Sequence, residues 1–253
     1  MKIIILCGGL GTRLAEETTV KPKPMVEIGG KPILWHIMKI YEKYAFSDFI
    51  LALGYKGEVI KEYFLDYHKL QNDIVINFNN NSVDYINQTS ENWKVSLIDT
   101  GSNTMTGGRL LRLREVLKNE ETFMLTYGDG VSDIDISKLL QFHNSHGKIA
   151  TITAVTPSAR FGGINIKNGN VVDFKEKPNS GEGLINGGFF VFQRKIFDYI
   201  SDDSTMLEHS PLENLVKDNQ LMAYVHDGFW QCMDTIRDKE VLQKKWEEGN
   251  ASW

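Results

Sequence analysis

Apolar runs of strand length alternate with amphipathic segments of helical spacing along most of this 253-residue chain. The apolar runs predict strands at Lys2–Cys7, Phe49–Leu53, Thr122–Tyr127, Ile149–Val155, Gly188–Phe192 and Met222–His226. The helical spacing predicts helices at Pro32–Tyr44, Glu58–Tyr67, Lys138–Ser145, Leu207–Lys217 and Lys239–Glu248. This alternation is typical of a mainly parallel sheet covered by helices. We therefore predict an α/β fold, a single Rossmann-like three-layer domain over residues 1–253 with a mainly parallel mixed sheet.

One region departs from this alternation. Between Asn72 and Thr100, apolar residues recur at every second position, first at 74, 76 and 78 and later at 95 and 97. Period-2 patterning around an asparagine-rich turn is typical of an antiparallel hairpin. We expect a small antiparallel β excursion at about residues 72–100, acting either as a lid over a site or as an arm that contacts another subunit.

Net charge, cysteine content and the length of apolar stretches indicate which partners and which compartment the protein has. The net charge of −5 argues against non-specific binding to nucleic acid or to an anionic membrane surface. Cys7 and Cys232 are isolated and lack metal-binding spacing, which favours a reducing compartment. No apolar stretch has the length of a membrane span or of a signal sequence. We expect a cytoplasmic protein that binds neither nucleic acid nor membrane.

A glycine-rich loop follows the first predicted strand. It reads Leu6-Cys7-Gly8-Gly9-Leu10-Gly11-Thr12-Arg13, and Lys23 follows between two prolines. Glycines allow the backbone to approach an anion and to direct N–H groups toward it, while the two basic side chains add positive charge. The loop lacks the Gly-Lys-Ser/Thr ending of a P-loop, and Leu14 replaces the third glycine of the dinucleotide fingerprint. The pattern indicates another class of nucleotide-binding protein.

Two acidic residues follow later strands of the predicted sheet. Asp129 lies between glycines after Thr122–Tyr127, and Asp234 follows a short loop after Met222–His226. Alone, the first is typical of a turn and the second of a helix N-cap. Ligands of α/β sheets bind at the carboxyl ends of strands, so both carboxylates are expected to face the glycine-rich loop. Two carboxylates opposite bound phosphates predict a Mg²⁺ site.

Two other motifs are weaker. Asp133-Ile134-Asp135 has the Asp-x-Asp form of metal-dependent glycosyltransferases, but its position favours the start of a helix. His143 and His146 fall on one face of a predicted helix without a third metal ligand. We interpret this pair as surface residues.

Several of these motifs together resemble the sugar-1-phosphate nucleotidyltransferase family. The matching segments are Leu6–Arg13, Lys21–Met25, Gly128-Asp129 and Glu176-Lys177-Pro178, and the similarity extends along the whole chain. Thr104–Arg109 and Phe229–Lys239 are most similar to the branch that acts on CTP and glucose 1-phosphate. Cys7 and Cys232 depart mildly from the family, which more often has alanine and proline there.

The resemblance implies an enzyme that forms CDP-glucose and pyrophosphate from CTP and glucose 1-phosphate with Mg²⁺. By family analogy, it would serve polysaccharide (O-antigen) biosynthesis and form a homo-oligomer. The implied catalytic residues are Arg13, Lys23, Asp129 and Lys177, and the implied metal ligands are Asp129 and Asp234. The implied nucleotide-binding residues are Leu6, Cys7, Gly8, Gly9, Leu10, Gly11, Thr12, Arg13, Lys23, Thr104, Arg109 and Gly128. The implied sugar-phosphate-binding residues are Glu176, Lys177, Asn186 and Gly187.

Other functions stay open from sequence. The same reaction could use another nucleotide, such as UTP or dTTP, or another sugar phosphate. A glycosyltransferase acting through Asp133 and Asp135 would leave Arg13 and Lys23 without a role. A non-catalytic nucleotide-sugar-binding regulator would not require Lys23 and both predicted metal ligands.

Overall fold

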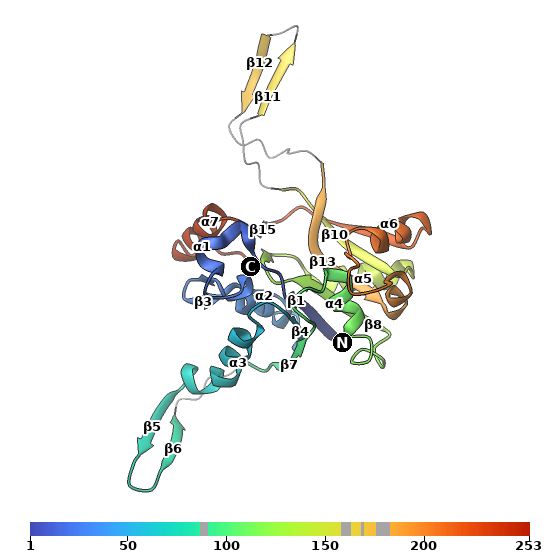
Figure 1. Ribbon diagram of the computed structural model, residues 1–253. Helices are drawn as coiled ribbons and strands as arrows, with labels where there is room; N and C mark the ends of the chain where they lie inside the picture. The colour runs from blue at the N-terminus through green and yellow to red at the C-terminus, as the bar shows by residue number, and fades with distance from the viewer. Residues whose placement is uncertain (87–90, 158–162, 168–169, 176–182) are drawn as a thin grey trace.

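A seven-stranded sheet forms the centre of the molecule, with the strand order β14-β10-β13-β8-β1-β4-β7 (Figure 1). The structure is a computed structural model and describes residues 1–86, 91–157, 163–167, 170–175 and 183–253. The sheet strands are β1 (Lys2–Cys7), β4 (Asp48–Leu53), β7 (Lys94–Asp99), β8 (Thr122–Tyr127), β10 (Ala150–Val155), β13 (Ile185–Gln193) and β14 (Leu221–His226).

β13 runs opposite to the other strands of this sheet. It pairs antiparallel with β8 and β10, whereas the pairs β8–β1, β1–β4, β4–β7 and β10–β14 are parallel. The first residues of β13 therefore lie at the edge where its neighbours end, and Asn186 pairs with Ala154 near the end of β10. At this carboxyl edge of the sheet, residues from distant parts of the chain lie close together.

Helices cover both faces of the sheet. The α-helices are α1 (Ala15–Thr18), α2 (Ile33–Glu42), α3 (Gly57–Gln71), α4 (Thr106–Arg112), α5 (Ile136–His146), α6 (Ser210–Lys217) and α7 (Ile236–Glu247). Short 3-10 helices are η1 (Thr12–Leu14), η2 (Lys23–Met25) and η3 (Arg194–Tyr199). Residues of α2, α3, α5 and α7 enter one core cluster, and residues of α4, α6 and η3 enter a second cluster.

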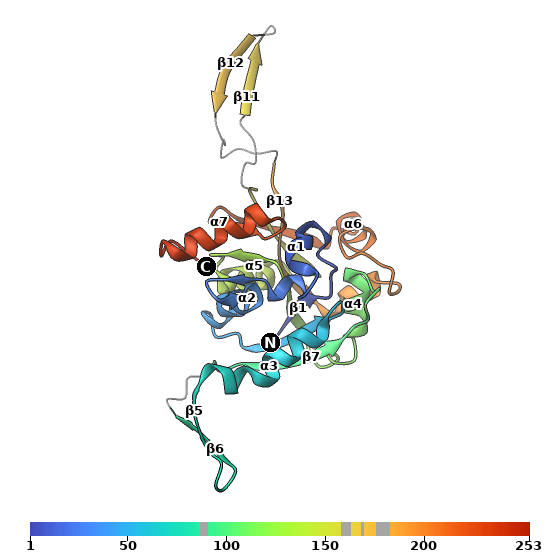
Figure 2. The same ribbon diagram turned by 60° about the vertical axis from the view of Figure 1, so that its left-hand side comes forward.

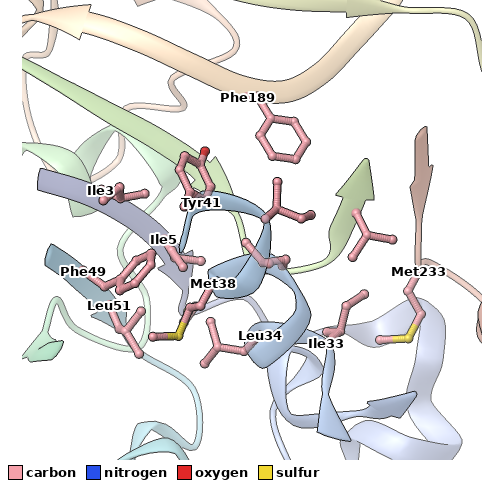
Figure 3. Packing of buried hydrophobic residues seen from close by; sticks show 14 of the residues in the cluster. Ile3, Ile5, Ile33, Leu34, Met38, Tyr41, Phe49, Leu51, Phe189 and Met233 are labelled. Atoms are coloured by element: carbon pink, nitrogen blue, oxygen red, sulfur yellow. The ribbon is translucent and has the colours of Figure 1, made fainter. Parts of the chain in front are cut away.

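Alternation along the strands separates the two clusters. Ile3 and Ile5 belong to the first cluster, while Ile4 and Leu6 belong to the second. Because successive strand residues point to opposite faces, a continuous apolar run fills both cores at once. Figure 3 shows the first cluster, where side chains of α2 pack against β1 and β4. The sheet is thus buried on both faces, as expected of a three-layer fold.

Four small antiparallel sheets complete the fold. They pair β2 (Glu27–Ile28) with β3 (Lys31–Pro32), β5 (Asp73–Asn77) with β6 (Ser82–Ile86), β9 (Gly130–Ser132) with β15 (Trp230–Cys232), and β11 (Gly163–Lys167) with β12 (Asn170–Lys175). The β5–β6 and β11–β12 hairpins project from opposite sides of the molecule (Figures 1 and 2). No helix in the described part of the chain is long and apolar enough to cross a membrane.

The predicted fold class is confirmed, but the β excursion is shorter than predicted. Within the described residues, only β5 and β6 form the antiparallel hairpin, whereas β7 is an edge strand of the main sheet, parallel to β4. A period-2 pattern marks a half-buried strand without specifying its partner, so Val95 and Leu97 were assigned to the wrong sheet. Most other predicted elements match within three residues, and α6 begins at Ser210 rather than Leu207.

Candidate active site

The glycine-rich loop connects β1 to the short helix η1 at the carboxyl edge of the sheet. Gly11 adopts a positive φ of 64° as the residue before η1, and its carbonyl oxygen accepts hydrogen bonds from the Leu14 N–H (2.9 Å) and the Thr18 hydroxyl (3.0 Å). An L side chain would strain the backbone at this position, because only glycine adopts this conformation without steric cost. Gly11 also lies close to Lys23, because a Cβ atom added at Gly11 would be 3.3 Å from the Lys23 Cβ.

The buried side chain of Arg109 binds the backbone of this loop. Although charged, it is only 4% exposed. Its guanidinium donates hydrogen bonds to the Gly8 (2.9 Å), Leu53 (3.0 Å) and Gly101 (2.6 Å) carbonyl oxygens, and also to the Thr100 hydroxyl (2.9 Å). A Cβ atom at Gly8 would lie 2.2 Å from the guanidinium carbon, so the close approach needs glycine. Arg109 therefore joins the ends of β1, β4 and β7.

The two candidate metal ligands are brought together by the β9–β15 pairing. Gly130 pairs with Cys232, and the Met233 N–H donates to the Asp129 carbonyl oxygen at 2.8 Å. This register places Asp129 and Asp234 side by side. Helix α7 is capped by the Thr235 side chain in a capping box with Asp238, so Asp234 does not serve as its N-cap.

Lys23 lies between these two carboxylates. Its Nζ is 2.7 Å from Asp129 Oδ2 and 2.5 Å from Asp234 Oδ1, while Arg13 contacts Asp234 Oδ2 at 3.1 Å. Burial alone would lower the pKa of Lys23, but the charges and hydrogen bonds of the two aspartates outweigh it and raise that pKa. Burial would raise the pKa of Asp234, yet Lys23 and then Arg13 lower it. The ammonium is therefore the counter-charge for both acids.

Two adjoining cavities open at this edge. The first has a volume of about 380 Å³ and the second about 550 Å³, and Arg13, Tyr127, Asp129 and Asp234 line both. Predicted site residues that line the first cavity are Leu6, Cys7, Gly8, Gly9, Gly11, Thr12, Arg13, Lys23, Thr104, Arg109, Gly128, Asp129 and Asp234. Leu10 is instead 57% exposed and does not line it. Arg13 and the two acids thus lie at the junction of the two cavities, and Lys23 lies on the side of the first.

The second cavity contains the described part of the predicted sugar-phosphate site. Asn186 and Gly187 line it, and the Trp230 indole donates to the Gly187 carbonyl oxygen at 2.7 Å. Asn186 Nδ2 donates to the Tyr127 hydroxyl at 3.3 Å, and its Oδ1 accepts from the Gly188 N–H at 2.8 Å. Glu176 and Lys177 lie outside the described residues, so their predicted roles stay predictions.

The two cysteines are unsuited to nucleophilic chemistry. Burial raises the pKa of the Cys7 thiol, and burial together with the neighbouring Asp234 charge raises that of Cys232 to about 12. Because the thiolate is the reactive form, these raised pKa values argue against a nucleophilic role for either side chain.

The weaker motifs have structural roles. Asp135 is the N-cap of α5 and accepts from the Lys138 N–H at 2.9 Å, as the helix-start interpretation predicted. The interpretation of the histidine pair as surface residues is wrong for His143, which is 2% exposed. Both imidazoles contact the Thr151 hydroxyl, at 2.9 Å and 2.7 Å. Thr151 lies on β10, so the histidine face of α5 packs on the sheet rather than facing solvent.

The donor set at the cavity junction suits a divalent cation that shares ligands with bound phosphates. No group of three or more His, Cys, Asp or Glu side chains that could hold a metal occurs in the described ranges. Two aspartates alone nevertheless suit Mg²⁺, which commonly takes one or two carboxylates and completes its shell with phosphate oxygens and water. The ammonium of Lys23 marks the position between them that attracts a cation.

The glycine-rich loop, Lys23 and the two acids thus lie beside two adjoining cavities at the carboxyl edge of an α/β sheet. The chain belongs to the nucleotidyl transferase family, whose model matches residues 2–243. Enzymes of this family generally use a divalent metal ion.

Some members of this family are similar to the chain over nearly their whole length. The chain is 53% identical over 253 residues to the glucose-1-phosphate cytidylyltransferase of Salmonella typhimurium, covering 100% of this chain and 98% of that protein. It is 46% identical to the probable glucose-1-phosphate cytidylyltransferase of Bacillus subtilis, covering 100% and 99%. The crystal structure of HddC from Yersinia pseudotuberculosis superposes with a TM-score of 0.70 at 26% identity, covering 97% and 99%.

Tyr127, Glu208 and Thr106 are among the cavity-lining residues that were not predicted from sequence. Tyr127 directly precedes Gly128-Asp129 at the end of β8, a position that could have identified it. Glu208 lies between η3 and α6, where the sequence carries no recognisable signal.

Proposed function

We propose that this protein transfers the cytidylyl group of CTP to glucose 1-phosphate, forming CDP-glucose and pyrophosphate. The full-length similarity to relatives named for this activity supports the choice of substrates. The observation that carries the reaction class is the junction of the two cavities at Arg13, Asp129 and Asp234, with Lys23 between the two acids. One cavity suits the nucleotide and the other suits the sugar phosphate.

The chemistry requires charge neutralisation more than a protein nucleophile. A phosphate oxygen of glucose 1-phosphate attacks the α-phosphorus of CTP, and the bond from that phosphorus to the pyrophosphate oxygen breaks. Both reactants are polyanions, and two unit charges about 4 Å apart interact by roughly 4 kcal/mol at an effective dielectric of 20. Arg13 and Lys23 offset this repulsion and stabilise the departing pyrophosphate.

Asp129 and Asp234 are proposed to hold Mg²⁺, with Lys23 released toward the phosphates. When bound there, Mg²⁺ would neutralise negative charge on the phosphates. The backbone of the Gly8–Arg13 loop binds the nucleotide phosphates through its N–H groups. Thr104 and Gly128 complete the nucleotide side of the site.

On the sugar side, Asn186 and Gly187 bind hydroxyl groups in the second cavity. Glu176 and Lys177 are proposed partners of the sugar and its phosphate, respectively, from the resemblance alone. We further propose one catalytic domain that acts in the cytoplasm as a homo-oligomer and supplies nucleotide-linked sugar for O-antigen polysaccharide. The exposed apolar side chains of the β5–β6 hairpin support the proposal of a homo-oligomer, because such a surface is typical of a subunit interface.

Pyrophosphate release tests this proposal directly. The protein is incubated with Mg²⁺ and glucose 1-phosphate and with CTP, UTP, dTTP, ATP or GTP in parallel. We expect release with CTP and at least about tenfold lower kcat/KM with the other nucleotides. Release with another nucleotide would keep the reaction class and change the base specificity. Binding of CDP-glucose without release for any nucleotide would favour a non-catalytic nucleotide-sugar-binding regulator.

A further inference from the structure

Glu208 connects the walls of the two cavities. Its Oε1 accepts a hydrogen bond from the Tyr127 hydroxyl at 2.5 Å, and its Oε2 accepts one from the Thr106 hydroxyl at 2.6 Å. Thr106 begins α4 and lines the first cavity, Glu208 lines the second, and Tyr127 lines both. One carboxylate therefore binds two hydroxyls of the cavity walls, one from a residue of the first cavity and one from a residue shared by both.

The carboxylate fixes the direction of each hydrogen bond around it. An ionised carboxylate can only accept, so both hydroxyl protons must point toward Glu208. The Thr106 oxygen is then free to accept from the Leu207 N–H, which lies 2.9 Å away. In the same way, the Tyr127 oxygen must accept rather than donate toward its other neighbour.

Asn186 is the next member of this chain of hydrogen bonds. Its Nδ2 donates to the Tyr127 oxygen at 3.3 Å, while its Oδ1 accepts from the Gly188 N–H at 2.8 Å. A backbone N–H can only donate, so this contact and the Tyr127 contact specify the same amide orientation. Among the described residues the second N–H of the Asn186 amide has no hydrogen-bond partner, so it is a donor available to a ligand in the second cavity.

We propose that Glu208 is a positioning residue for the sugar phosphate. Through Tyr127 it sets the amide of Asn186 so that an N–H, and not the carbonyl oxygen, faces the ligand. The group of the sugar opposite Asn186 is then a hydrogen-bond acceptor, such as the oxygen of a hydroxyl that donates elsewhere. This inference rests on the proposed function, which assigns the second cavity to the sugar phosphate.

Glu208→Gln is the main test because it keeps the shape of the side chain and removes the acceptor-only constraint. Its amide can donate to Tyr127, which then no longer has to present a lone pair to Asn186. We expect the KM for glucose 1-phosphate to rise about tenfold, with the KM for CTP changed less than about twofold. Glu213→Gln, an exposed acid on α6, is the matched control and leaves both KM values unchanged.

Tyr127→Phe removes the hydroxyl that connects Glu208 to Asn186. It is therefore expected to raise the KM for glucose 1-phosphate to a similar extent. Because both residues act in series, the double variant should be no worse than the more affected single variant. Additive losses would contradict this serial arrangement. Equal increases of both KM values with a lower melting temperature would identify Glu208 as a residue of general structure and overturn the positioning role. An unchanged KM for glucose 1-phosphate would overturn it as well.

The two proposals fail in different ways. A wild-type protein that releases no pyrophosphate with any nucleotide refutes the proposed function. Calorimetric binding of glucose 1-phosphate to the wild type and to Glu208→Gln then decides the positioning role. An affinity lower by about tenfold in the variant supports it, and equal affinities overturn it.

Discussion

Lys23 and Asp129 form an ion pair of 2.7 Å although they are 106 residues apart in the sequence. Asp234 holds the same ammonium from the other side, and Lys23 is only 13% exposed there. A cation of the protein thus occupies the space between two acids that are proposed to bind Mg²⁺. If the acids bind a metal ion, it must compete with the Lys23 ammonium for the two carboxylates, and this competition can be measured without turnover.

Lys23→Met is expected to strengthen divalent-cation binding while abolishing activity. Removing the ammonium leaves both carboxylates without their counter-charge, so Mn²⁺ in the absence of nucleotide should bind at least about tenfold more tightly. Mn²⁺ titration followed by electron paramagnetic resonance measures this affinity. Lys21→Met, which removes a lysine paired with Glu27, is the matched control. Weaker Mn²⁺ binding in Lys23→Met would show that the lysine does not compete for this position.

Asp129→Asn and Asp234→Asn are each expected to lower kcat by at least about a thousandfold. An amide of the same shape keeps the packing but removes the charge that holds the cation. Pyrophosphate release at saturating Mg²⁺ measures the loss, and thermal unfolding shows that the fold is retained. Asp227→Asn, which alters an exposed acid beyond β14, should retain activity. Near-normal turnover in either site variant would remove that residue from the metal site.

Arg109→Lys is expected to weaken the fold as well as nucleotide binding. A lysine keeps the charge, but it cannot reach the several carbonyl oxygens that the guanidinium fork contacts. Leaving these buried acceptors unpaired should lower the free energy of unfolding by about 2–3 kcal/mol, measured by urea denaturation. Arg112→Lys, at an exposed residue of α4 paired with Asp203, is the control. A higher KM for CTP with unchanged stability would instead indicate direct contact with the nucleotide.

Acid should destabilise the protein through the buried histidine of α5. Burial, and then the positive charge of His146, lower the pKa of His143 to about 4, whereas an unfolded histidine titrates near 6.5. The unfolded chain therefore binds more protons between these values, and the stabilisation present above pH ~6.5 is lost as the pH falls toward 4.

We expect His143→Gln to lessen this loss, by about 1 kcal/mol per pH unit over that range, in urea denaturation series. His209→Gln, at an exposed histidine, should leave the slope unchanged. Parallel curves for the wild type and His143→Gln would assign the acid sensitivity to other groups.

The β5–β6 hairpin is the segment we expect at a subunit interface. It projects from the body (Figure 2), and its apolar side chains are unusually exposed, with Phe78 at 85%. Large exposed apolar patches commonly mark contact surfaces. Phe78→Lys should therefore lower the mass measured by light scattering, whereas Val216→Lys, at an exposed valine of α6, should not. An unchanged mass for Phe78→Lys and for a variant lacking residues 73–86 would exclude this hairpin from the interface.

Local patterns were sufficient to predict much of the fold and which residues lie around the glycine-rich loop. The apolar run Lys2–Cys7 indicates a strand, and the glycines directly after it indicate a turn. Both signals are local, so the β1 loop was predictable. Asp129 and Asp234 could be paired because strand ends meet at one edge of the sheet. Their shared contact with Lys23 was not predictable, since no residue spacing encodes it.

Long-range partners explain what the sequence could not reveal. Arg109 binds main-chain carbonyl oxygens, which every residue has, so its acceptors leave no trace in the sequence. Glu208 acts on Tyr127 across 81 residues, within a segment of ordinary composition. His143 was misassigned because helical spacing shows which residues share a face but not whether that face meets the sheet. In each case tertiary contacts, rather than local propensity, determine the role.

The reversed direction of β13 also bears on how this enzyme family can diversify. Asn186 and Gly187 reach the reaction edge at the start of a strand, directly after the part of the chain that contains the β11–β12 hairpin. The glycine-rich loop and Lys23 come instead from the first 25 residues. A single contiguous replacement from the end of β10 into the start of β13 would therefore exchange Asn186 and Gly187, which are proposed to bind the sugar, and would leave the glycine-rich loop and Lys23 in place. Chimeric enzymes exchanged at these two strands provide a natural route to new nucleotide sugars.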